Sequence, residues 1–366
     1  MENRIVQPEE SIIKEIQEQR PRWSPGLLSK AEKDMLIERA LVGLYRWYLA
    51  RSQTTRNWNP DKTFNWRKLR TDHSEGLNKL VEGFYAIEQY VPDYTSKQVM
   101  ITRASHGRSH FQIRWGAEEE KHADLWLNAI LFLRQRTVQW VEEYKHTLRA
   151  MEFQLPWEDP LHMVFYATLQ ERATQLNYLG TALIARGQSD KPGFEHDADP
   201  VLEQAATTIA TDEVAHYSFF LEIARVYLYY YPAQTLEALV DVIKNFAMPA
   251  MNIIPNGAEF SETVHRSGVY GLRTYAQDVL QVVFDQIGVK GRRALEEGVR
   301  RMRQVPDDAG HLRDTTVLNG LDYHAVEDAV KRLFDRIQKY EQEVGLAEVD
   351  PTRFRLSGLP VQATES

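Results

Sequence analysis

Apolar side chains recur at helical spacing along most of the chain from about residue 72 onward, and strand-like alternation is rare. The first 70 residues are also helical in pattern, but Pro21, Pro25 and Pro60 interrupt them. Prolines, glycines and runs of polar residues interrupt the helical pattern at further points. The pattern predicts helices over residues 72–92, 105–147, 160–187, 200–230, 234–247, 260–288, 290–303 and 321–345.

A helical bundle is the architecture that this pattern favours. Several predicted helices are long, and no extended linker rich in glycine or serine divides the chain. We therefore expect an all-α fold with one large helical domain over residues 71–346, preceded by a helical extension over residues 1–70. Residues 347–366 show no periodicity and are expected to form an irregular tail.

The composition narrows the chemistry. The 366 residues include no cysteine, which excludes disulfide scaffolds, thiolate nucleophiles and iron–sulfur clusters. The net charge of −8 argues against nucleic acid as a partner. No stretch approaches the roughly 18 apolar residues of a membrane span, and the first twenty residues resemble no targeting signal. We expect a cytoplasmic protein without a membrane span, in which any metal is held by histidine, aspartate and glutamate.

One short motif, Glu-x-x-His, places a carboxylate and an imidazole one turn apart on the same helix face. This spacing lets one helix offer two ligands to one metal ion. The motif alone is weak evidence, because it occurs four times. The four pairs are Glu119/His122, Glu143/His146, Glu213/His216 and Glu262/His265.

The neighbouring residues separate the four pairs. Glu119 shares its helix face with Trp115 and Trp126, and Glu213 shares its face with Ile209 and Phe220. Both carboxylates are therefore expected to point into an apolar core, where an unpartnered charge is costly and a metal ion is one of the few remedies. The pairs that begin at Glu143 and Glu262 lack such a face, and we expect both to be exposed to solvent.

Two further glutamates, Glu88 and Glu171, also lie on apolar helix faces. The order along the chain is then Glu, Glu-x-x-His, Glu, Glu-x-x-His, which matches the dimetal carboxylate sites of ferritin-like four-helix bundles. Four carboxylates balance two divalent cations, and oxygen and nitrogen donors without sulfur suit iron or manganese. The expected ligands are Glu88, Glu119, His122, Glu171, Glu213 and His216.

Three segments resemble sequence boxes of the soluble acyl-[acyl-carrier-protein] desaturases, the stearoyl-type enzymes of plastids and their bacterial relatives. The resemblance extends from about residue 58 to 300, and Tyr217, where plant members carry a charged residue, points to the bacterial branch. Shorter similarities lie at residues 58–60, 248–250 and 267–270. The three boxes are W-G-A-E-E-E-K-H-A-D-L over residues 115–125, Q-E-R-A-T over 170–174 and D-E-V-A-H over 212–216.

The resemblance implies an O2-dependent desaturase with two Fe2+ ions per chain. It would introduce a cis double bond into a fatty acyl chain, and the six expected ligands would hold the iron. Asp212 would accept the free N–H of a ligand histidine. Thr174 would lie beside the oxygen-binding site, although a threonine bonded to its own helix is equally consistent. Trp58 would lie on an electron path or serve packing.

The resemblance also implies partners. The acyl chain would be a thioester on acyl carrier protein, a ferredoxin-type donor would supply two electrons, and the chain would form a homodimer. Arg273 and a basic segment from Lys290 to Arg303 are candidates for docking these acidic proteins. An apolar tunnel would hold the acyl chain, with candidate lining residues Trp126, Phe165, Tyr178 and Phe220.

Alternatives stay open at this point. The thioester could be on CoA, and the chemistry could be hydroxylation or oxygenation of another tethered substrate. A metal-storing or structural ferritin-like bundle would keep the ligands without turnover, and a radical-generating reductase subunit would need a tyrosine near iron. The residues do not define the chain length or the double-bond position, because these depend on the depth of the tunnel.

Overall fold

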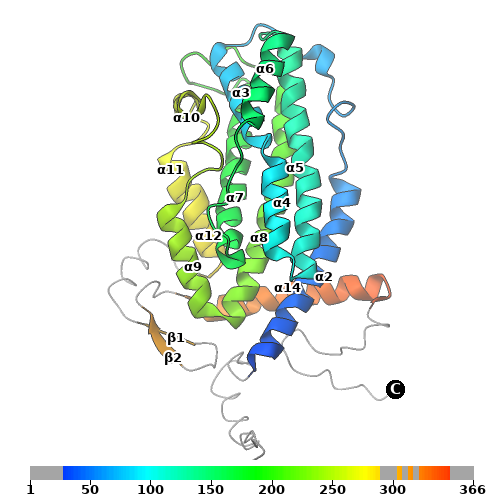
Figure 1. Cartoon of the computed structure of the whole chain (residues 1–366), viewed down its shortest axis with the longest axis vertical. Helices are drawn as coiled ribbons and strands as arrows, with labels where there is room; N and C mark the ends of the chain where they lie inside the picture. Colours follow the sequence, from blue (N-terminus) through cyan, green and yellow to red (C-terminus); the bar gives the residue numbers. More distant parts are fainter. Residues whose placement is uncertain (1–27, 289–302, 307–311, 316–320, 347–366) are drawn as a thin grey trace, which may run out of the picture. The chain divides into compact units, whose positions relative to one another are not determined.

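The computed structural model describes residues 28–288, 303–306, 312–315 and 321–346 (Figure 1). The helices are α2 (Lys30–Thr55), α3 (Glu75–Glu88), α4 (Val91–Thr102), α5 (His106–Leu133), α6 (Val138–Arg149), α7 (Pro160–Ala185), α8 (Pro200–Tyr230), α9 (Pro232–Asn245), α10 (Gly257–Arg266), α11 (Leu272–Thr274), α12 (Gln281–Gln286) and α14 (Tyr323–Glu343). Shorter elements are the 3-10 turn η2 (Trp66–Lys68), the π-helical turn η3 (Tyr275–Leu280) and strands β1 (Arg303–Pro306) and β2 (Leu312–Thr315).

The larger of two compact units comprises residues 41–224 and 238–286 and contains the bundle. Within it α3, α5, α7 and α8 run along one another, and they carry all the expected metal ligands (Figure 1). Their facing surfaces are filled by large apolar and aromatic side chains, among them Phe111, Trp126 and Phe220. The prediction of an all-α, ferritin-like bundle with additional helices is confirmed, apart from the short antiparallel β1–β2 ribbon.

The helix predicted over residues 105–147 is two helices. The Ser105 side chain caps the start of α5 by accepting from the Arg108 N–H, and α5 ends where Arg134 adopts a left-handed conformation with φ of 57°. The Thr137 side chain then caps α6 by accepting from the Trp140 N–H. This threonine is the signal in the sequence that marks the second start. Glu143 therefore lies on a different helix from Glu119.

The helix predicted over residues 72–92 ends early, at Glu88, and a separate helix α4 follows a break at Gln89 and Tyr90. Pro92 lies in the first turn of α4, where its missing N–H would have no partner in any case. The proline therefore begins a helix, and the expected ligand Glu88 is the last residue of α3.

The segment predicted as one helix over residues 260–288 is divided. Helix α10 ends at Arg266, Gly268 takes a left-handed φ of 70°, and the chain turns before entering α11, η3 and α12. The turn matters for the site because Tyr270, Gly271 and Leu272 line a cavity described below.

The second unit includes α14, whose buried face follows helical periodicity through Val326, Val330, Leu333 and Ile337. Asp322 caps this helix by accepting from the Ala325 N–H. The predicted helix over residues 290–303 and the predicted tail 347–366 fall outside the described residues, except that Arg303 begins β1. The division into segments 1–70, 71–346 and 347–366 stays a prediction.

Among the described residues, no helix combines the length and the apolar character needed to cross a bilayer.

Candidate metal centre

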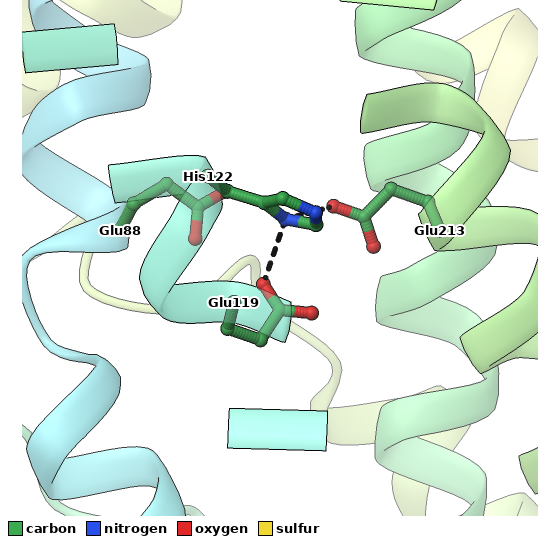
Figure 2. Close-up of side chains that lie close together, drawn as sticks. All are labelled: Glu88, Glu119, His122 and Glu213. Carbon is green, nitrogen blue, oxygen red and sulfur yellow. Dashed lines mark hydrogen bonds and ion pairs between the residues drawn. The ribbon is translucent and has the colours of Figure 1, made fainter. Parts of the chain in front are cut away.

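Carboxylates and imidazoles from the four bundle helices meet in the core. The ligand atoms fall into two overlapping groups, and within each group they lie within 4.8 Å of one another. All of these side chains are buried. The first group is Glu88, Glu119, His122 and Glu213 (Figure 2), and the second is Glu119, Glu171, Glu213 and His216.

Glu119 and Glu213 belong to both groups and lie between the two imidazoles. Nδ1 of His122 is 3.1 Å from one oxygen of Glu119 and 3.4 Å from one oxygen of Glu213 (Figure 2). Nδ1 of His216 is 2.9 Å from the other oxygen of Glu119 and 3.5 Å from the other oxygen of Glu213. Each carboxylate thus offers one oxygen to each side, which is the arrangement of a bridging ligand. Glu88 and Glu171 occupy the two ends.

Several of these atoms have no hydrogen-bond partner. Burying such an atom unsatisfied costs about 1–3 kcal/mol. Although His216 Nδ1 is close to Glu119, the pair is not aligned as a hydrogen bond, so the atoms face a shared space and not one another. The residues therefore fit two divalent cations, which would satisfy these atoms and balance the four carboxylates. The unpartnered atoms are Glu119 Oε1, Glu171 Oε2, both oxygens of Glu213 and His216 Nδ1.

The protonation of the cluster leads to the same conclusion. Burial raises the pKa of Glu88 and of Glu171 well above the usual value, and neighbouring carboxylates raise it further. Burial alone would lower the pKa of His122, but the charge of Glu119 and the hydrogen bond to Asp212 raise it well above its usual value. Without cations, the cluster therefore retains protons to offset its negative charge.

Asp212 lies beside His122, as the resemblance implies. Its Oδ2 is 3.3 Å from His122 Nε2, the ring nitrogen that faces away from Glu119 and Glu213. The same oxygen accepts a 2.8 Å hydrogen bond from Trp58 Nε1, and the Trp58 and His122 rings are parallel with centroids 6.0 Å apart. Lys121 and Arg56 lie 3.6 and 3.4 Å from the Asp212 carboxylate. Asp212 is thus placed to orient the imidazole so that Nδ1 faces the cluster.

Glu118 has the matching position beside the other histidine, a role that the sequence analysis did not assign to it. Its buried carboxylate lies 2.9 Å from His216 Nε2 and accepts hydrogen bonds from the hydroxyls of Tyr48 and Ser52. Both hydroxyls come from α2, far away in sequence. The available signal was positional, since Glu118 precedes Glu119 as Asp212 precedes Glu213.

A cavity of about 540 Å³ is lined mainly by apolar side chains, including Phe84, Met248, Phe260 and Leu272. None of the six expected ligands lines it, but its wall meets the cluster at Tyr178, whose hydroxyl donates to Glu88. Thr174 lies in its wall, and the Thr174 hydroxyl donates 2.9 Å to the carbonyl of Gln170 in its own helix. Of the four aromatic residues suggested for a tunnel, Tyr178 lines this cavity. The other three, Trp126, Phe165 and Phe220, are buried outside its lining.

The remaining motif residues lie away from the cluster. Glu143 and His146 are exposed on α6, and Glu262 and His265 are exposed on α10, as expected. Most of the basic segment from Lys290 onward falls outside the described residues, whereas Arg273 is exposed on α11.

The family model that matches this chain and two similar curated proteins are all named as desaturases. The family model described as fatty acid desaturase matches residues 80–309. The chain is 30% identical over 185 residues to stearoyl-[acyl-carrier-protein] 9-desaturase 5 of Arabidopsis thaliana, covering 48% of this chain and 44% of that protein. It is 28% identical over 208 residues to palmitoyl-[acyl-carrier-protein] 4-desaturase of Coriandrum sativum, covering 54% and 51%. The chain spans about half the length of the curated relatives it matches.

The matched segment is more than half of the chain and includes every side chain that converges in the cluster. It also includes the three boxes on which the resemblance was based. The chain belongs to the fatty acid desaturase family.

Proposed function

We propose that the protein is an O2-dependent diiron desaturase that introduces a cis double bond into a fatty acyl chain carried on acyl carrier protein. The observation that carries the proposal is the adjacency of the buried ligand cluster and the apolar cavity. Ile87, next to Glu88, and Thr174, one turn after Glu171, both line the cavity. An acyl chain in the cavity would therefore lie against the ligand-bearing segments.

Two iron ions held by Glu88, Glu119, His122, Glu171, Glu213 and His216 would supply the activation of O2 that side chains cannot provide. The acyl chain loses two hydrogens from adjacent methylenes. O2 takes up these hydrogens together with two electrons and two protons, giving two molecules of water. The electrons come from a ferredoxin-type donor.

The residues of the chain prepare this reaction in three ways. Asp212 and Glu118 accept hydrogen bonds from the Nε2 atoms of the two histidines, which directs Nδ1 of each ring to the metal position. The apolar cavity wall excludes water and aligns the methylenes. The contact of Trp58 with both Asp212 and the His122 ring supports a route for electrons from the protein surface.

Carrier protein is proposed as the partner because several matched relatives are named for acyl-[acyl-carrier-protein] substrates. Leu272 lines the cavity and is 88% exposed, so it marks a point where the cavity reaches solvent. Arg273, exposed beside it, suits an acidic carrier. A homodimer and a cytoplasmic location stay predictions.

The test is turnover with defined components. Iron-loaded protein, ferredoxin, its reductase and NADPH are incubated with stearoyl- or palmitoyl-carrier protein, and in parallel with the CoA thioesters, before mass spectrometry of the acyl chain. Loss of two hydrogens from the carrier-bound chain supports the proposal. Reaction of the CoA thioester alone would contradict the choice of carrier, an added oxygen would indicate hydroxylation, and an unchanged chain with iron bound would favour a storage role.

A further inference from the structure

The two end carboxylates of the cluster are held by different kinds of donor. Glu171 accepts a 2.9 Å hydrogen bond from the indole Nε1 of Trp115, a residue of the bundle core that is not part of the described cavity lining. Glu88 accepts a hydrogen bond from the hydroxyl of Tyr178, which does line the cavity. Only one end of the cluster is therefore tied to the cavity wall through its hydrogen-bond donor.

Tyr178 connects the two regions through its ring. The ring packs edge-on against Phe84, with centroids 5.0 Å apart, and in a tilted arrangement against Trp126, with centroids 5.6 Å apart. Phe84 also lines the cavity and packs against Phe260, another lining residue, at 5.4 Å. The contacts thus run from the cavity wall through the Tyr178 ring to its hydroxyl and on to Glu88.

Glu88 is joined to the same wall through the backbone. The preceding residue, Ile87, lines the cavity, and Glu88 itself is the last residue of α3 before the break at Gln89 and Tyr90. Both partners of the Tyr178–Glu88 hydrogen bond therefore contact or adjoin the space that an acyl chain would fill. At the other end of the cluster, Trp115, the donor to Glu171, is not among the residues that line the cavity.

We propose that Tyr178 is a positioning residue that couples occupancy of the cavity to the Glu88 carboxylate. An acyl chain packed against the Tyr178 ring shifts the ring and its hydroxyl. This would move the Glu88 carboxylate relative to His122, with which it would hold one metal ion, and would leave Glu171 and His216, which would hold the other ion, in place. The inference rests on the proposed function and adds a response of the metal centre to substrate. A ligand can shift such an equilibrium only through different contacts in the two states, and the ring supplies those contacts.

The test reads the two metal positions separately, without turnover. Protein loaded anaerobically with ⁵⁷Fe2+ is measured by Mössbauer spectroscopy with and without palmitate, and palmitate binding is measured by calorimetry. We expect palmitate to change one of two iron signals in the unaltered protein. Tyr178→Phe keeps the ring and removes the hydroxyl, so palmitate should still bind, but the palmitate-induced change should be lost.

Trp115→Phe is the matched control because it removes the donor to the other end carboxylate. It should alter the second iron signal and retain the response to palmitate. Phe84→Leu leaves the hydroxyl bond in place and weakens the packing of the ring, so the response should shrink.

Three results would overturn the coupling. They are bound palmitate that leaves both iron signals unchanged, a full response in Tyr178→Phe or Phe84→Leu, and failure of palmitate to bind the unaltered protein. These results are distinct from a failure of the proposed function. A protein that responds to palmitate but desaturates no acyl chain keeps the coupling and loses the desaturase assignment, and an active desaturase without the response does the reverse.

Discussion

Glu118 and His216 are hydrogen-bonded across the bundle, 2.9 Å apart, although each belongs to a different Glu-x-x-His segment. Asp212 and His122 form the reciprocal pair at 3.3 Å. Each segment on α5 or α8 thus supplies two candidate ligands and, from the residue before its glutamate, the acceptor for the imidazole of the other segment. Arg56 lies 3.7 Å from Glu118 and 3.4 Å from Asp212, between the two acceptors.

This reciprocal pairing of acceptors and histidines predicts that Glu118→Ala weakens metal binding without removing a ligand. Loss of an acceptor behind a ligand histidine lowers metal affinity by about 10- to 100-fold. Iron titration of the metal-free protein measures the effect. Glu120→Ala is the control, because Glu120 is exposed two positions further along the same helix. Equal iron affinity in the two variants would contradict the role of Glu118.

The four Glu-x-x-His pairs give a second prediction. Glu213→Ala should abolish iron binding and activity, since its two oxygens face both imidazoles. Glu143→Ala should do neither, because Glu143 is exposed and accepts a 2.8 Å hydrogen bond from Gln139 on α6. Metal analysis should give two irons per chain for the unaltered protein and for Glu143→Ala. Loss of iron in Glu143→Ala would show that the ligands are wrongly assigned.

Much of the candidate site could be predicted because helices convert sequence spacing into proximity. A glutamate and a histidine three residues apart share a face, and apolar neighbours indicate which face is buried. That reasoning selected the side chains which the structure brings together, including Glu88 and Glu171, which have no histidine beside them. That they bind iron stays a prediction.

The parts that escaped prediction depend on contacts distant in sequence or on single backbone angles. Glu118 has buried partners on α2, and no periodicity within α5 reveals them. The end of α5 depends on the left-handed conformation of Arg134, which side-chain pattern does not encode. The Tyr178–Glu88 pair joins residues 90 positions apart. Single-helix patterns therefore located the candidate ligands but not the groups that position them.

Gly83 provides a packing prediction at the cavity wall. A Cβ at this position on α3 would lie 2.0 Å from the ring of Phe260, so only glycine lets α10 approach this closely. Gly83→Ala should lower the free energy of unfolding by about 1–3 kcal/mol, as expected for overpacking. Urea denaturation measures the change.

The double variant Gly83→Ala/Phe260→Leu tests the cause of this loss. Because the two residues are in contact, their effects should not add, and the smaller leucine should recover part of the stability. Additive losses would show that the ring of Phe260 is not what the new methyl group meets.

His73 predicts a pH dependence of stability. Its ring lies between Asp197 and Asp199, 3.4 and 3.1 Å away, in a cluster that joins the start of α3 to the start of α8. Burial alone would lower the pKa of His73, but the two carboxylates raise it above its usual value. Burial alone would raise the pKa of Asp197 and of Asp199, but hydrogen bonds, with His73 first among them, lower both.

These pKa shifts determine how the free energy of unfolding changes with pH. Because the pKa of His73 is raised by folding, its contribution to stability is complete below its unfolded pKa, about 6.5, and is lost as the pH rises through the folded value. The lowered aspartate pKa values contribute above the unfolded value of about 3.9, and that contribution is lost in acid. Stability from this cluster should therefore be greatest between about pH 4 and 6.5.

His73→Asn should remove the decline on the alkaline side, so that its free energy of unfolding changes less than that of the unaltered protein between pH 6 and pH 9. Denaturant unfolding at several pH values, at constant metal loading, measures this difference. If the free energy of unfolding varied with pH in the same way in both proteins, His73 would not carry the charge that binds the two aspartates.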